Sequence, residues 1–206
     1  MEHTNEWNFY LDSLRELSKK TDPKYAVDAE DAREALDVLY DCENAADSGD
    51  EYALCSLAAY KVQRGIDFAE NLAYLEELAE KDNTRALNAL GFLYAVGVFN
   101  QFDKSKTSLI HISDDANVAK SNEYFEKSAN LGSAKAMIQR AVKLSLDATN
   151  DEISCEEREN AARKAEEWAE KAKKTNEEGK CDCDWDYHLP ILEDRLSDMR
   201  DRLHCK

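Results

Sequence analysis

Residues 84–98 read TRALNALGFLYAVGV, a run apolar enough for a buried strand but spaced like a helix. Ala86, Leu90 and Tyr94 recur at four-residue steps, which places them on one face of an α-helix. Gly91 stands in the middle, where glycine costs about 1 kcal/mol relative to alanine on an exposed helix. That cost is offset if a larger side chain from an adjacent helix fills the space above the glycine. The stretch therefore predicts a helix that packs very closely against a neighbour.

The composition favours helices along the whole chain. The 206 residues include only 2 prolines and 6 glycines, and 43% of them are hydrophobic. Proline breaks helix interiors and glycine weakens them, and the apolar fraction is sufficient to bury a core. We therefore expect an all-α protein.

The charge of the chain argues against two classes of partner. With 44 acidic and 27 basic residues the formal net charge is −17. A nucleic-acid binder gains its affinity mainly from basic residues that neutralise phosphates, and an anionic membrane surface also attracts basic segments. Residues 1–50 hold 14 acidic and 5 basic residues. They form either a solvated helical face or a surface for a basic partner.

Three segments repeat one pattern: residues 43–60, 76–94 and 126–144. Each ends an amphipathic helix in small residues, turns within a few residues and opens a second helix at an alanine, as stacked helical hairpins do. Glycine in a turn can take the left-handed conformation that ends a helix, and Asn, Ser or Thr can cap the next one. The turns are Ser48-Gly49-Asp50, Asp82-Asn83-Thr84 and Leu131-Gly132-Ser133, and the alanines are Ala53, Ala86 and Ala136.

Extending this pattern predicts an α/α superhelix, or solenoid, of about four antiparallel hairpins and a C-terminal capping helix in one repeat domain, 1–206. Ser154 and Glu157 form a capping box at the start of one helix, and Pro190 falls in the first turn of the closing helix. The expected repeats are about 5–50, 51–83, 84–133 and 134–178, with the cap at 186–206 and an insertion loop at 99–117. The expected helices are 5–20, 30–47, 51–64, 67–81, 84–97, 117–131, 134–148, 155–175 and about 189–204.

The unit that begins at residue 84 resembles a Sel-1-like repeat, a relative of the tetratricopeptide repeat. The family pattern runs Ala, Leu-Gly, Tyr and Gly, then an aromatic pair, Ala, Gly and Ala. The resemblance covers about 43–145, and the flanking units are degenerate. The positions that match, together with the alanine of the preceding unit, are Ala53, Ala86, Leu90, Gly91, Tyr94, Gly97, Ala119, Tyr124, Phe125, Ala129, Gly132 and Ala136.

The resemblance implies a right-handed α-solenoid that binds a protein or peptide and acts as a scaffold or adaptor, in signalling, protein degradation or bacterial pathogenesis. The first helix of each hairpin would then line a concave groove. The chain departs from the family in having only about four units and in its 99–117 insertion. The predicted partner-binding residues, taken as exposed positions of these first helices, are Tyr60, Lys61, Asn88, Tyr94, Gln139 and Lys143.

The insertion 99–117, FNQFDKSKTSLIHISDDAN, is the most individual segment. Loops of this length without structure of their own are uncommon and are often functional. We expect one of three outcomes: it contacts a ligand on the concave face, it packs its apolar residues back onto the array, or it is partly disordered.

The segment CDCDWDYHLP, residues 181–190, carries an alternative function. A metal- or redox-linked protein could act through Cys181, Cys183 and Cys205, with His188 as a further metal ligand. A Cys-x-Cys pair matches zinc spacing less well than Cys-x-x-Cys, so we expect no resident metal or other cofactor. In an intracellular chain of this length we expect free thiols rather than disulfides.

No motif in the chain indicates catalysis. It contains no phosphate-cradling glycine loop, no HExxH and no nucleophile elbow. We therefore expect a protein that is not an enzyme, although an enzyme without a recognisable motif stays a third hypothesis. The acidic N-terminus lacks the pattern of a secretory signal, so we expect a cytoplasmic location.

Overall fold

The structure is a computed structural model that describes residues 4–21, 26–96 and 115–203. Within these ranges it is all-helical, with no strand. This confirms the predicted fold class. The helices are α1 (Asn5–Ser18), α2 (Ala26–Asp47), α3 (Glu51–Arg64), α4 (Phe68–Glu80), α5 (Thr84–Val96), α6 (Asp115–Asn130), α7 (Ala134–Ala148), α8 (Cys155–Glu177) and α9 (Trp185–Arg202).

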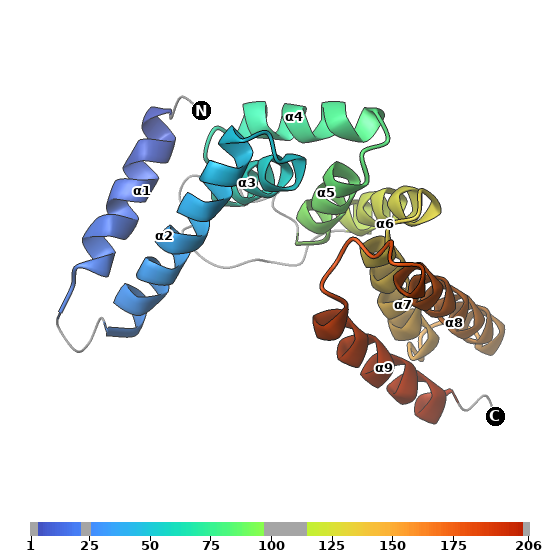
Figure 1. Cartoon of the computed structure of the whole chain (residues 1–206). Helices are drawn as coiled ribbons and strands as arrows, with labels where there is room; N and C mark the ends of the chain where they lie inside the picture. Colours follow the sequence, from blue (N-terminus) through green and yellow to red (C-terminus); the bar gives the residue numbers. More distant parts are fainter. Residues whose placement is uncertain (1–3, 22–25, 97–114, 204–206) are drawn as a thin grey trace.

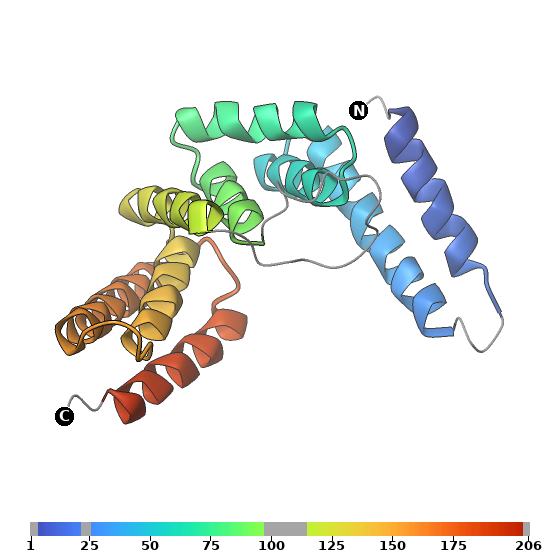
Figure 2. The ribbon, with the colours of Figure 1, turned by 180° about the vertical axis from the view of Figure 1, so that it is seen from behind.

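The helices follow one another along an arch, with the two termini near its opposite ends (Figures 1 and 2). Each helix packs against the next one in the chain, and α3 also contacts α5 while α7 contacts α9. In Figure 1, α4 lies on the outer side of the arch, and α3 and α5 lie beneath it. This sequential stacking of α-hairpins is a solenoid-like arrangement.

The three predicted turns between hairpins are built in the same way. Gly49, Asp82 and Gly132 each have a positive φ, of 85°, 61° and 98°. The residue after each of them donates its backbone N–H to a carbonyl five residues earlier, at 3.0 to 3.1 Å. This is the Schellman bond that ends a helix. Asp82 adopts the left-handed conformation without being a glycine.

The same residues then cap the following helices. The side chain of Asp50 accepts from Ala53 N at 2.9 Å, that of Asn83 from Ala86 N at 3.0 Å, and that of Ser133 from Ala136 N at 3.2 Å. One residue therefore ends a helix and begins the next. The alanines predicted to open these helices, Ala53, Ala86 and Ala136, are buried.

At Gly91, helices α5 and α6 approach each other closely. A Cβ placed there would lie 3.0 Å from the ring of Phe125, which is itself buried. The large neighbouring side chain predicted to fill the space above Gly91 is therefore Phe125. Leu90 and Leu93 are fully buried beside it.

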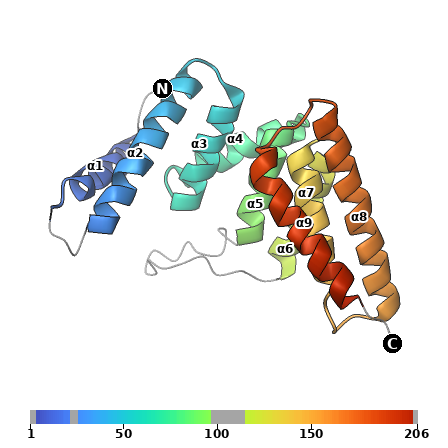
Figure 3. The same cartoon turned by 60° about the horizontal axis from the view of Figure 1, so that its bottom comes forward.

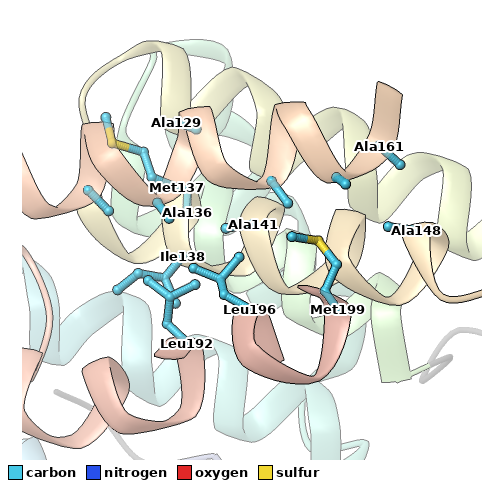
Figure 4. Packing of buried hydrophobic residues seen from close by; sticks show 14 of the residues in the cluster. Ala129, Ala136, Met137, Ile138, Ala141, Ala148, Ala161, Leu192, Leu196 and Met199 are labelled. Carbon is cyan, nitrogen blue, oxygen red and sulfur yellow. The ribbon is translucent and has the colours of Figure 1, made fainter. Parts of the chain in front are cut away.

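Three buried clusters run along the arch, one for each part of the stack. The C-terminal cluster is rich in alanine, because α8 presents Ala161, Ala165, Ala169 and Ala172 at three- and four-residue steps. Small residues let α8 lie close to α7. Figure 4 shows the larger side chains of this cluster, Leu192, Leu196 and Met199 of α9, pointing toward Ile138 and Ala141 of α7.

Several boundaries differ from the sequence prediction, chiefly the starts of α2, α6 and α9. Helix α2 begins at Ala26 rather than at 30. The closing helix begins at Trp185 rather than at about 189, because Asp184 accepts a hydrogen bond from Tyr187 N at 3.2 Å. Pro190 is therefore inside the helix and not in its first turn. Helix α6 begins at Asp115, within the predicted insertion 99–117. Residues 99–114 and Gly97 lie outside the described residues.

Replacing Gly91 by alanine tests the nesting of α5 and α6. The added methyl group improves helix propensity by about 1 kcal/mol, but crowding a packed ring costs about 1–3 kcal/mol. We expect a net destabilisation of about 1 kcal/mol in urea unfolding. In a Phe125→Leu background, where the ring is gone, Gly91→Ala should become stabilising.

The control is Ala73→Gly on the exposed face of α4, which should lose only the propensity contribution of about 1 kcal/mol. If Gly91→Ala and Phe125→Leu are simply additive, the two residues are not in contact and the described packing is wrong.

Candidate binding site

A hollow of about 290 Å³ opens between α3, α5 and α7. Its apolar walls include Ala59 of α3, Ala89 and Phe92 of α5, and Phe125 of α6. The two alanines leave space that a larger residue would fill. Phe92 is 50% exposed, so part of the apolar wall faces solvent.

The hollow is built from equivalent positions of the repeat. Tyr52, Arg85 and Lys135 each directly precede the alanine that opens its helix, and all three line the hollow. Four residues later, Ser56, Ala89 and Gln139 also line it. Positions four apart share a helix face, so the common turn-and-cap geometry aims the same face of α3, α5 and α7 into one space.

A polar network beside the hollow links α5 to the connection between α8 and α9. Asn88 Nδ2 donates to Ser133 Oγ at 2.9 Å, and Ser133 Oγ donates to Asp182 Oδ2 at 2.5 Å. The other carboxylate oxygen of Asp182 accepts from Lys135 N at 2.9 Å. Asp182 is therefore fully engaged at the start of α7, where a negative charge also complements the helix dipole.

This network fixes the orientation of the Asn88 amide. A carboxylate only accepts, so the single hydroxyl proton of Ser133 goes to Asp182 and Ser133 must accept from the amide nitrogen of Asn88. The carbonyl oxygen Oδ1 of Asn88 is left buried and without a hydrogen-bond partner in the described structure. Such an atom costs about 1–3 kcal/mol. The side chain is only 7% exposed, so this acceptor is covered, although Asn88 itself lines the hollow.

Two cations lie at the hollow, in a chain whose net charge is −17. The Arg85 guanidinium lies 5.5 Å from the centre of the Tyr52 ring. Within the part of the chain that the structure describes, neither Arg85 nor Lys135 forms an ion pair. Among the residues that line the hollow, these two positive charges face the single negative charge of Asp182, so positive charge is in excess.

A second hollow lies beside the first, between α1 and the end of α3. It is lined by Phe9, which is 76% exposed, and by Tyr10 and Arg64. The hydroxyl groups of Tyr10 and Tyr60 are 2.6 Å apart. Tyr10 lines the second hollow and Tyr60 lines the first, so the two hollows are neighbours along the stack.

Of the six residues predicted to bind a partner, three line the first hollow: Tyr60, Asn88 and Gln139. Lys143 lies one turn beyond Gln139, where it is ion-paired with Asp147. The expectation that all six are exposed is wrong for Lys61, Asn88 and Tyr94, which are all buried. Lys61 is 6% exposed, with its ammonium 4.6 Å from the centre of the Trp7 ring.

Tyr94 faces helix α6 rather than the first hollow. It is 8% exposed, and its ring stacks on that of Tyr124 with centroids 5.6 Å apart. Its hydroxyl accepts from Lys120 Nζ at 2.6 Å. Six residues after Asn88, it falls on a different side of α5. Tyr94 is therefore a packing residue between α5 and α6.

The sequence prediction missed Arg85, Lys135 and Asp182. The first two carried a signal, because they occupy one repeat position, directly before Ala86 and Ala136. The sequence held no such signal for Asp182, since the position of this residue depends on the path of the chain between α8 and α9.

The cysteines behave differently from one another. Cys42, Cys55, Cys181 and Cys183 are free, and burial raises the pKa of Cys55 to about 11. The expectation of free thiols is wrong for Cys155, which is disulfide-bonded. No three potential ligands gather into a metal site within residues 4–21, 26–96 and 115–203, and Cys205 lies outside these ranges.

The comparisons with known proteins add no relative. The chain matches no protein-family model, and no curated protein and no solved structure matches it at a significant level. The resemblance to the Sel-1-like repeats stays a prediction from the sequence. Separately, none of the described helices combines the length and the apolar character that crossing a bilayer requires.

Asp182→Ala should weaken the start of α7. It removes the acceptor of both Ser133 Oγ and Lys135 N, so we expect a loss of about 1–2 kcal/mol in unfolding free energy. Amide hydrogen exchange at Lys135 should become faster. The control Asp186→Ala, on the exposed first turn of α9, should leave that exchange rate unchanged, and equal effects of the two variants would contradict the network.

Proposed function

We propose that the chain is a non-enzymatic interaction module that binds an extended segment of another polypeptide along α3, α5 and α7. The observation that carries the proposal is the buried, unpaired carbonyl oxygen of Asn88 between apolar walls. A backbone N–H of a bound peptide is a donor of the right kind for it, and it reaches the covered oxygen once the side chains above Asn88 move aside. The Sel-1-like pattern of the sequence supports the same class of function, a scaffold or adaptor, and we propose a cytoplasmic one.

The size of the hollow favours a side chain over a whole small molecule. Small-molecule sites measure about 300–1,000 Å³, and this hollow, at about 290 Å³, is at the lower limit. Ala59, Ala89 and Phe92 supply an apolar surface for one large side chain of the peptide. The second hollow, across Tyr60, offers a place for a further residue of the same segment.

The charge at the hollow favours an acidic segment. The sequence led us to consider a basic partner because residues 1–50 are strongly acidic. The walls of the first hollow have the opposite character, since Arg85 and Lys135 have no carboxylate partner among the described residues. An acidic residue of the peptide beside its apolar anchor would pair with either cation.

A selection from a library of displayed random peptides, carried out on the intact chain, tests the groove. We expect enriched peptides with an apolar residue next to Asp or Glu. Asn88→Ala should lower their affinity about fivefold to tenfold, which corresponds to one hydrogen bond of about 1–1.4 kcal/mol. Lys143→Ala, one turn away, is the matched control and should bind like the wild type. Failure to enrich peptides, or equal affinity of all three proteins, would remove the groove hypothesis.

Reversing one charge tests the sign of the partner. Arg85→Glu should weaken binding of an enriched acidic peptide at least tenfold at low salt, with a smaller effect at high salt because of screening. Lys143→Glu makes the same charge change outside the hollow and should have little effect. If Arg85→Glu strengthens binding, the partner is basic and the assignment is wrong.

A further inference from the structure

Two thiols lie side by side in the connection from α8 to α9. Cys181 Sγ and Cys183 Sγ are 3.2 Å apart, and Cys181 Sγ is also 3.4 Å from the carbonyl oxygen of Cys183. Both cysteines are free and partly exposed. By contrast, Cys55 is 3% exposed, so a reagent in solution reaches the pair far more easily than this buried thiol.

The backbone holds the pair in place at both ends. Gly179 has a φ of 69°, and Lys180 N donates to Thr175 O at 3.0 Å, which closes α8 just before the first cysteine. Asp184 caps α9 just after the second. Between the cysteines, Asp182 is bound to Ser133 and to Lys135 N of α7. The connection is visible in Figure 3 as the loop that joins the upper ends of α8 and α9.

We propose that Cys181 and Cys183 form a reversible disulfide by exchange with a small-molecule disulfide such as glutathione disulfide. The inference stands on the thiol geometry and does not depend on peptide binding. A disulfide requires the two sulfur atoms to approach from 3.2 Å to about 2.05 Å. This movement is small for a connection outside any helix.

The exchange balances with the small disulfide as oxidant. The Cys181 thiolate attacks one sulfur of glutathione disulfide, which forms a mixed disulfide and releases one glutathione thiolate. Cys183 then loses its proton and attacks the Cys181 sulfur, which closes the Sγ–Sγ bond and releases the second glutathione. The protein dithiol loses two electrons and two protons, and the small disulfide is reduced to two thiols.

The surroundings of Cys183 disfavour it as the first thiol to attack, while its distance from Cys181 favours it for the second step. Burial, the hydrogen bond with Cys181 and the charge of Asp182 raise the pKa of Cys183 to about 12. The thiolate is the attacking form, so Cys183 is slow to attack a disulfide in solution. Once Cys181 is in a mixed disulfide, the neighbouring sulfur is already within 3.2 Å.

Closure of the disulfide reaches the first hollow through Asp182. Asp182 lies between the two cysteines and holds Ser133 and Lys135 N at the start of α7. Ser133 in turn holds Asn88. We expect that drawing the two cysteines together moves Asp182 and loosens these hydrogen bonds.

Peptide mapping of the intact wild-type chain tests the site. Tryptic cleavage after Lys180 and Arg195 isolates both thiols in the peptide 181–195, which holds no other cysteine. After treatment with glutathione disulfide and alkylation, this peptide should be unalkylated and two hydrogen atoms lighter than its reduced form. A reductant should restore two alkylatable thiols. Two alkylated thiols at every ratio of glutathione disulfide to glutathione would overturn the proposal.

The variant Cys183→Ser distinguishes exchange from other oxidation. Without the second thiol, Cys181 should remain in a stable mixed disulfide and the peptide should carry one glutathionyl group. Cys181→Ser should react more slowly, because burial, the largest cause of the raised pKa of Cys183, and the charge of Asp182 remain in this variant. Equal labelling of both variants would contradict the assigned order of attack.

Hydrogen exchange measures the link to the hollow without any ligand. Oxidation of the wild type should accelerate amide exchange at Lys135 and Ala136 at least threefold and leave the first turn of α3 unchanged. An oxidised peptide with unchanged exchange at α7 would overturn the link to the hollow. A failure of peptide binding would leave both readouts unaffected, so the two proposals fail separately.

Discussion

The backbone hydrogen bond that closes each turn between hairpins is the constraint on which the rest of the structure depends. At residues 50, 83 and 133 the backbone N–H donates to a carbonyl five residues earlier and so ends one helix. The side chain of the same residue then caps the next helix. Because the turn is the same each time, α3, α5 and α7 begin in the same orientation relative to the helix before them. Helices that begin alike present equivalent positions to the same side, and those positions line the hollow.

The structure also depends on close packing between neighbouring helices, which small residues make possible. Gly91 lets the ring of Phe125 lie against the backbone of α5, and the alanines of α8 let that helix lie close to α7. The same property leaves space on the inner side, where Ala59 and Ala89 stand between larger residues. The polar atoms at this place are not all satisfied internally, since the carbonyl oxygen of Asn88 has no partner among the described groups. Native proteins rarely keep such an atom, which is the reason for the proposal that a ligand binds there.

Much of the fold could be predicted from local sequence. Turn chemistry and apolar spacing placed every described helix, and Gly91 indicated a close neighbour before Phe125 was known to be that neighbour. The start of α9 was misplaced because Pro190 was assumed to belong to a first turn, whereas Asp184 makes the stronger cap. The start of α6 was misplaced because no local signal separates Asp115 from the segment before it.

The site was harder to predict because it depends on which helix face meets which neighbour. Periodicity shows that a helix has two faces, but both faces of α5 are partly covered, one by α6 and one by the other inner helices. Tyr94 was therefore assigned to the wrong side. The net charge of the chain, −17, gave no indication of Arg85 and Lys135. It is a sum over all residues and does not reveal that two cations line the same hollow. The most direct test of the stacking is the nuclear Overhauser spectrum of the isotopically labelled chain. Cross-peaks between the side-chain amide protons of Asn88 and the backbone amide of Ala136 are the predicted result, and their absence, with cross-peaks from α5 to some other helix instead of α7, would contradict it.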